Sequence, residues 1–289
     1  MNPIAMWFAA GSPFFVGIAL TVVLLLWLTK RQVKGAARRF GIIGVIVGVL
    51  FVAMSATPIL PLTVLYLLWP FFIVRTLWRI PGDKAGSRFR QYYPLGIVVI
   101  ISALMVGFEV PYRIAPRIEV GAAKDLYVIG DSLCGGAPTE QENWPELLGK
   151  ALGLTTHNYS HGGATVRSAE HNAKRVEQAG ALVIVWVGGN DMLKGAATKD
   201  YAAGLETILK HVCGNGRQVV MMELPLIPGF NGYGIAQRRL AEQYGITLLP
   251  KRLLADVLGT QGSTVDGLHF STRGHALIAQ SMLTVFSVQ

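Results

Sequence analysis

Four long apolar stretches precede residue 112, and they constrain the fold of this chain more than any other feature of its sequence. They cover residues 6–29, 40–56, 60–78 and 93–110. A bilayer core about 30 Å thick is crossed by roughly 17–25 helical residues, so each stretch is long enough to cross it, the middle two only just. We therefore predict an α-helical transmembrane region of about four helices within residues 1–120, followed by a separate domain over residues 121–289.

The basic residues are concentrated in the same apolar part of the chain. Residues 1–123 contain 12 Lys or Arg and 3 Asp or Glu, whereas residues 124–289 contain 14 of each kind, so the first part carries the whole net charge of +9. This distribution is typical of loops that flank a membrane rather than of a surface that binds nucleic acid. We therefore expect the lipid bilayer as a partner and no nucleic acid. A charged content of 15% and a mean hydropathy of +0.43 also disfavour an ordinary cytosolic enzyme.

Two basic loops indicate the orientation of the chain in the membrane. Residues 30–39 carry five basic residues and no acidic one, and residues 75–90 carry five basic residues and one acidic one. By the positive-inside rule both loops are cytoplasmic, so the chain leaves the membrane on its outer side near Pro111. We expect a multi-pass protein of the bacterial inner (cytoplasmic) membrane whose second domain is periplasmic or extracellular. A single kinked or re-entrant element over residues 40–78 is the alternative; it would give three crossings and a cytoplasmic second domain.

Short apolar runs alternate with helical patterns after residue 124. The predicted strands are residues 125–130, 155–160, 181–187, 218–224 and 246–249, and the predicted helices are residues 144–152, 165–178, 201–212, 233–244 and 272–286. Strands that alternate with helices form a parallel sheet covered on both faces, so we predict an α/β domain. Ligand sites in such sheets lie at the carboxyl ends of the strands, where the loops of interest should meet.

A serine and a histidine in these loops suggest nucleophilic catalysis. Ser132 lies in a Gly-Asp-Ser-Leu sequence directly after the first strand, and His269 ends an Asp-Gly-Leu-His sequence just before the last helix. The Asp three residues before the histidine, Asp266, can accept the imidazole Nδ1–H and leave Nε2 as a general base. Taken alone, each motif also fits residues that cap a helix.

Two glycine-containing turns follow neighbouring strands. The first contains Gly163 at a strand-to-helix turn, where a glycine lets backbone N–H groups approach a ligand closely. The second, Gly-Gly-Asn-Asp over residues 188–191, contains Asn190, whose side-chain amide can point at a developing oxyanion. Taken alone, both also fit turns that need a left-handed backbone. His157 and His161 have the spacing of metal ligands on a helix, but they lie in a strand and a glycine turn, so we expect no metal site.

Together and in this order, the four motifs resemble the SGNH (GDSL) hydrolase family over residues 125–280. The sequence GGNDMLKG over residues 188–195 and the pair Trp144-Pro145 are similar to the thioesterase/lysophospholipase and arylesterase branch. The resemblance implies a flavodoxin-like three-layer α/β domain with a parallel sheet. The N-terminal membrane region has no counterpart in those free-standing enzymes.

The resemblance also implies a role for each site residue. Ser132 would be the nucleophile, His269 the base and Asp266 the residue that orients it. The backbone N–H groups of Ser132 and Gly163 and the side chain of Asn190 would form the oxyanion hole, with no metal and no organic cofactor. Two cysteines, Cys134 and Cys213, leave a disulfide between them open.

We therefore expect a membrane-anchored serine esterase that removes an acyl group, short like acetyl, from an acylated envelope glycan or lipid through an acyl-serine intermediate. One alternative is an O-acyltransferase to a cell-surface polysaccharide, which would use the same triad together with a membrane partner protein. A second alternative is a non-catalytic membrane assembly protein. The short linker over residues 111–124 favours a membrane-associated substrate, and a piece of the chain beginning near Ala122 should contain everything that small esters need.

Overall fold

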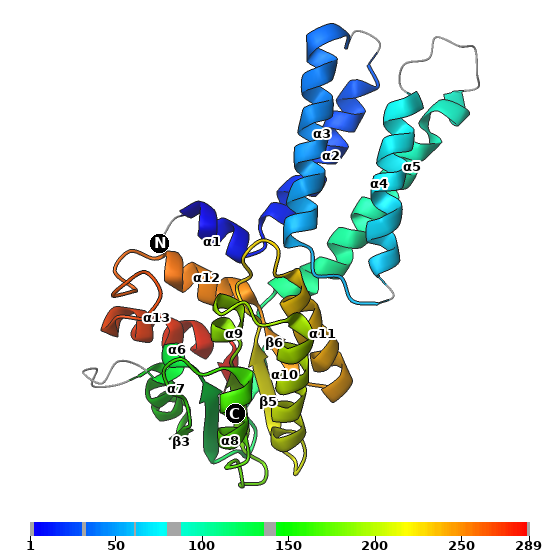
Figure 1. The fold of residues 1–289 in the computed structure, drawn as a ribbon. Helices are drawn as coiled ribbons and strands as arrows, with labels where there is room; N and C mark the ends of the chain where they lie inside the picture. Colours follow the sequence, from blue (N-terminus) through cyan, green and yellow to red (C-terminus); the bar gives the residue numbers. More distant parts are fainter. Residues whose placement is uncertain (1–2, 31–32, 61, 80–87, 136–142, 288–289) are drawn as a thin grey trace. The chain divides into compact units, whose positions relative to one another are not determined.

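The computed structural model describes residues 3–30, 33–60, 62–79, 88–135 and 143–287. Its contacts divide the chain into two compact units, shown in Figure 1. The sheet unit comprises residues 1–10 and 112–289, and the helical unit comprises residues 11–111. The sheet unit is therefore discontinuous in sequence, whereas the boundary expected from the sequence falls between residues 120 and 121.

Five parallel strands form the centre of the sheet unit. They are β2 (Asp125–Gly130), β3 (Thr155–Asn158), β4 (Leu182–Trp186), β5 (Gln218–Met222) and β6 (Thr247–Leu249), in the order β3-β2-β4-β5-β6. Every residue of β4 is buried, as expected for a central strand covered on both faces. This order is the flavodoxin-like one, with its switch point between β2 and β4. The predicted parallel α/β fold is confirmed, and each strand lies within the range predicted for it.

Helices cover both faces of the sheet, because alternate residues of each strand point to opposite faces. Leu126 and Ile184 belong to the core of one face, and Tyr127 and Val183 to the core of the other. The first face is covered by α7 (Trp144–Leu152), α12 (Lys251–Gly259) and α13 (Thr272–Leu283), and the second by α8 (Val166–Ala173), α10 (Thr198–Val212) and α11 (Asn231–Tyr244). The domain therefore has the three layers that the sequence predicts.

Several features of the sheet unit differ from the prediction, among them α8, which ends at Ala173 rather than at residue 178. Helix α12 was not predicted, although it repeats apolar residues at helical spacing and buries Leu254 and Leu258 against the first face. The last predicted helix ends at Leu283 rather than Phe286. Phe286 instead belongs to the short strand β7 (Phe286–Ser287), which pairs in parallel with β1 (Ile118–Glu119).

The first apolar stretch, predicted as one helix over residues 6–29, is two helices in the structure. Helix α1 (Pro3–Ala9) ends before Gly11, whose φ of +73° is left-handed, and α2 (Pro13–Leu28) begins at a proline, which has no N–H to continue the earlier helix. The two helices also belong to different units. Helix α1 packs on α12 in the sheet unit, whereas α2 belongs to the helical unit.

The helical unit consists of two packed pairs of helices, α2 with α3 (Gly35–Ser55) and α4 (Thr63–Arg79) with α5 (Arg88–Glu109). Glycine brings α2 and α3 together, because a Cβ added at Gly17 would lie 2.5 Å from the Gly48 carbonyl oxygen. Between α4 and α5, Trp69 Nε1 donates a buried hydrogen bond of 2.8 Å to Ser102 Oγ. Both pairs are thus held by specific contacts of their own.

Two described helical segments are long and apolar enough to cross a membrane. They are α3 (Gly35–Ser55) and Tyr92–Arg113, which combines most of α5 with the short turn after it, whereas the apolar helix α2 (Pro13–Leu28) is shorter. Helix α4, the last of the four helices expected to cross the membrane, carries Arg75 and Arg79 and is not among these apolar helices. Part of the second basic loop, residues 80–87, lies outside the described residues.

Candidate active site

Ser132 lies directly beyond β2, at the carboxyl edge of the sheet, where it begins the short helix α6 (Ser132–Gly135). Asp131 caps this helix, because its Oδ1 accepts a hydrogen bond of 3.0 Å from the Leu133 N–H. Gly130 leaves no space for a side chain, since an added Cβ would lie 2.5 Å from Cys134 Sγ. The turn that carries Ser132 is therefore tightly determined.

His269 reaches Ser132 from the loop before α13. Its Nε2 lies 3.1 Å from Ser132 Oγ, and its Nδ1 lies 2.6 Å from Asp266 Oδ2. The other carboxylate oxygen of Asp266 accepts the backbone N–H groups of Leu268 and His269 at 2.9 and 2.8 Å. The hydrogen bond from the His269 ring, aided by these two N–H groups, holds the pKa of Asp266 well below its usual range. An ionised Asp266 fixes the proton on Nδ1 and leaves Nε2 free to accept the hydroxyl proton of Ser132.

Asn190 lies on α9 (Gly189–Leu193), which follows β4 on the other side of the switch point from Ser132. Its Nδ2 donates to the Ala164 carbonyl at 3.0 Å, and an amide nitrogen has a second N–H to offer. Gly188 precedes it with a φ of +120°, and an added Cβ there would lie 2.5 Å from the Tyr201 ring. Only glycine fits this position, so the turn fixes the place of Asn190.

The turn that contains Gly163 is tied to α9. Gly163 has a φ of +73°, and its carbonyl accepts Lys194 Nζ at 3.3 Å. Asp191 Oδ2 accepts the Val166 N–H at 3.0 Å, in addition to the bond from Asn190 to Ala164. Three hydrogen bonds therefore connect residues 163–166, at and after the Gly163 turn, to residues 190–194, which follow β4.

Three polar side chains that the sequence analysis did not assign to the site support α6. Trp144 Nε1 donates to the Leu133 carbonyl at 3.0 Å, Asn158 Nδ2 to the Cys134 carbonyl at 3.0 Å, and Asn143 Nδ2 to the Gly135 carbonyl at 2.8 Å. The last carbonyls of a helix lack partners within it, so these bonds satisfy groups that would otherwise be unpaired. The Trp144–Leu133 bond joins residues 11 apart on different elements, so no local sequence signal predicts it.

Asp131, which precedes Ser132 in the Gly-Asp-Ser-Leu sequence, is a fourth side chain at the site with no role predicted from the sequence. Its side chain lies next to Ser132, and the residue is only 4% exposed. Burial disfavours the charged form and raises its pKa from 3.8 to about 6, against the opposing effects of the Leu133 N–H and His269. A carboxyl group that changes charge near neutral pH thus adjoins the Ser132–His269 pair.

Neither the two histidines singled out in the sequence nor Cys213 joins this site, whereas Cys134 lies buried in α6. His157 Nε2 lies 2.8 Å from Asp125 Oδ1, and His161 Nδ1 lies 3.3 Å from Asn172 Nδ2. Within the described ranges, no group of three or more His, Cys, Asp or Glu side chains could hold a metal ion. Cys134 and Cys213 are both free thiols, and burial raises the pKa of the Cys134 thiol well above its usual value.

Residues 128–277, just over half of the chain, match the GDSL-like Lipase/Acylhydrolase family. The chain belongs to this family. The match begins in β2 and ends in α13, so it contains all five predicted site residues and leaves out α1 and the helical unit. As a GDSL-like acylhydrolase, the chain is an enzyme of the SGNH esterase type.

Individual relatives agree with the family match. The arylesterase of Vibrio mimicus is 29% identical over 174 residues, which cover 55% of this chain and 86% of that protein. Esterase TesA of Pseudomonas aeruginosa is 29% identical over 166 residues, which cover 52% of this chain and 82% of that protein. The crystal structure of the psychrotrophic esterase EstA from Pseudoalteromonas sp. has the same fold, with a TM-score of 0.51 and 20% identity over 56% of this chain and 96% of that one.

Proposed function

We propose that this GDSL-like acylhydrolase cleaves carboxylic esters with Ser132 as nucleophile, His269 as general base and Asp266 as the residue that orients His269. Two contacts that join the three side chains carry this assignment. Ser132 Oγ lies 3.1 Å from His269 Nε2, and His269 Nδ1 lies 2.6 Å from Asp266 Oδ2. A nucleophile within hydrogen-bond reach of a base that is itself oriented by a third group is the arrangement that activates a serine.

The reaction follows from this geometry in two halves. Ser132 Oγ attacks the ester carbonyl carbon while its proton moves to His269 Nε2. The tetrahedral intermediate then breaks its bond to the alcohol oxygen, which leaves with the proton from His269, and the acyl group remains on Ser132. In the second half, water attacks the acyl-serine and gives its proton to His269. The carboxylic acid is released as Ser132 regains its proton.

The oxyanion of each tetrahedral intermediate is proposed to bind the backbone N–H groups of Ser132 and Gly163 and the side-chain amide of Asn190. The hydrogen bonds between the Gly163 turn and α9 support this assignment, because they hold two of the three donors in place before substrate binds. Donors that are already positioned stabilise the developing charge without reorganisation, and each contributes roughly 10²–10³ to the rate.

The helical unit is proposed to anchor the enzyme by four crossings of the bacterial inner membrane, with the sheet unit on the periplasmic or outer side. The two long apolar helices and the basic first loop support this topology. So does the discontinuity of the sheet unit: residues 10 and 112 both belong to it, and Arg113 Nη1 donates a hydrogen bond to the Ala10 carbonyl. Two points on one folded unit lie on one side of a membrane, so the chain between them crosses an even number of times. Three crossings do not satisfy this condition.

The substrate of an anchored esterase is proposed to be an acylated lipid or envelope glycan at the membrane surface. Anchoring raises the effective concentration of such a substrate near the site without any new contact. A soluble ester would gain nothing from the anchor.

The decisive experiment compares wild-type protein with Ser132→Ala and the control Ser281→Ala, each full length in nanodiscs. We expect Ser132→Ala to lower kcat on p-nitrophenyl acetate by about 10⁶, and Ser281→Ala to match wild type. Product analysis with an added glycan acceptor then separates free acid, the expected product, from a transferred acyl group, which would indicate an acyltransferase. Substantial activity in pure Ser132→Ala would remove Ser132 from its role, and no activity in wild type would favour a non-catalytic assembly protein.

A further inference from the structure

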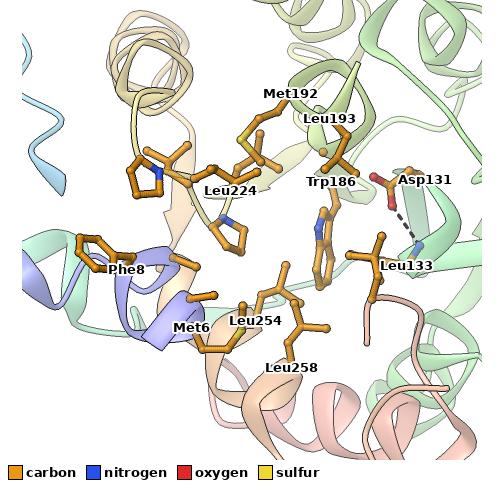
Figure 2. Close-up of a pocket in the computed structure, with 18 residues that line it drawn as sticks. Met6, Phe8, Asp131, Leu133, Trp186, Met192, Leu193, Leu224, Leu254 and Leu258 are labelled. Carbon is orange, nitrogen blue, oxygen red and sulfur yellow. Dashed lines mark hydrogen bonds between the residues drawn. The ribbon is translucent and has the colours of Figure 1, made fainter. Parts of the chain in front are cut away.

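An apolar cavity of about 350 Å³ lies in the sheet unit beside the catalytic residues (Figure 2). Three of the site motifs contribute to its wall: Asp131 and Leu133 flank Ser132, Gly189 precedes Asn190, and Leu268 precedes His269. An ester whose carbonyl lies at Ser132 Oγ is therefore adjacent to the cavity, which is positioned to receive one of the two groups joined by the ester bond.

The chemistry of the wall indicates which group enters. Among the described residues that line the cavity, Asp131 is the only one with a charged side chain, and most of the others are aliphatic, aromatic or sulfur-containing. A sugar placed there would lose hydrogen bonds to water without replacing them, whereas a hydrocarbon chain would lose none. The cavity therefore fits the acyl chain of the ester.

One wall of this cavity is α1. Met6 and Phe8 line it from one side, and Trp186 and Leu133 lie on the other side (Figure 2). Met6 also packs against the core of the first sheet face, and α1 contacts α12, which contributes Leu254 and Leu258 to the same cavity. Helix α1 is thus an integral part of the site, although it lies outside the residues that match the family.

We propose that α1 is a specificity element of the esterase: Met6 and Phe8 close the acyl pocket and limit the chain it accepts to about ten carbons. This proposal rests on the proposed function of Ser132. A water molecule has a share of about 30 Å³ in the liquid, and a methylene group is of similar size, so 350 Å³ holds roughly ten such groups. The acetyl group expected from the sequence would leave most of the pocket unfilled.

The test measures kcat/KM for p-nitrophenyl esters from acetate to tetradecanoate. The protein is full length in nanodiscs, because detergent would compete for an apolar pocket. For wild type we expect kcat/KM to rise with acyl length, by at most about fourfold for each buried methylene, and to fall beyond about ten carbons. Met6→Trp fills part of the pocket, so the ratio of kcat/KM for decanoate to that for acetate should fall about tenfold. Met6→Ala enlarges the pocket and should shift the optimum to longer chains.

The matched control is Ile4→Trp, the same substitution on the same helix at a residue that is 65% exposed and does not line the cavity. It should leave the decanoate-to-acetate ratio at the wild-type value. If Met6→Trp does not fold, the direction of the Met6→Ala shift decides instead. Ser132-dependent cleavage of acetate with a profile that neither Met6 variant changes would overturn the proposal for α1 and leave the proposed function standing. Failure of wild type to cleave any ester would overturn both.

Discussion

Asp131→Asn should stabilise the sheet unit at alkaline pH, although it alters the residue next to the nucleophile. The pKa of Asp131 in the folded protein is about 6, raised from an ordinary value of 3.8 by burial. A rise of this size corresponds to roughly 3 kcal/mol between the two protonation states. Asparagine keeps a side-chain oxygen that can accept the Leu133 N–H, and it carries no charge at any pH.

The direction of this change in the free energy of unfolding follows from proton binding by Asp131. Between pH 3.8 and about 6 the folded protein holds a proton on Asp131 that the unfolded chain has released. The stability linked to this proton is complete below pH 3.8 and is lost as pH rises through 6. At pH 8 the wild-type fold retains a buried carboxylate that the unfolded chain would expose to water. Removal of that charge should therefore raise the free energy of unfolding by up to about 3 kcal/mol at pH 8 and by little at pH 4.

The assay is thermal unfolding of the full-length protein in nanodiscs, followed by tryptophan fluorescence at pH 4 and pH 8. In a domain of this size 1 kcal/mol shifts Tm by roughly 2–4 °C, so Asp131→Asn should raise Tm by about 6–12 °C at pH 8. Asp256→Asn is the control, because the Asp256 side chain is 68% exposed and its charge is already solvated. A variant that is no more stable than wild type at pH 8, or equally stabilised at both pH values, would refute the assignment of a buried, destabilising charge to Asp131.

Three further predictions test the site and the topology. Asn190→Ala should lower the kcat of ester hydrolysis by about 10²–10³ with little change in KM, because the side chain is proposed to act on the oxyanion; a change in KM alone would make it a substrate-binding residue. Asp266→Asn should lower kcat by about 10⁴, since an amide no longer fixes the proton on His269 Nδ1, and wild-type kcat in this variant would contradict the triad. With Cys213 replaced by serine, Gln261→Cys should react with an impermeant maleimide in intact spheroplasts and Lys34→Cys should not; the reverse pattern would place the sheet unit in the cytoplasm.

The residues of the candidate site were predictable because their signals are local. Ser132 and Asn190 each follow a strand within a few residues, and the chain order of the strands brings both to one switch point. His269 and Asp266 lie three residues apart, so their mutual contact is also short-range. The features of the site that the sequence does not predict, such as the burial of Asp131, depend on packing by residues far away in the sequence.

The N-terminal stretch shows where the sequence is ambiguous. An apolar helix has the same composition whether it faces lipid or a protein core, so hydropathy joined α1 to α2 across Gly11. Gly11 and Pro13 mark the break locally, but the packing of α1 on α12 is a long-range contact, and α12 was itself not predicted. The expectation that a piece beginning near Ala122 suffices for small esters stays a prediction, and such a piece would lack α1, which forms one wall of the cavity. It should retain more activity on acetate than on decanoate.

The discontinuity of the sheet unit also sets an order of events during synthesis. Helix α1 leaves the ribosome before the helical unit, but its partner α12 emerges only after most of the sheet has been made. Contacts between such distant segments form late, because the intervening chain must first be brought to a single place. Helix α1 therefore reaches its partner α12 only after the helical unit and most of the sheet have been made, so the cavity wall that α1 forms is completed late in synthesis.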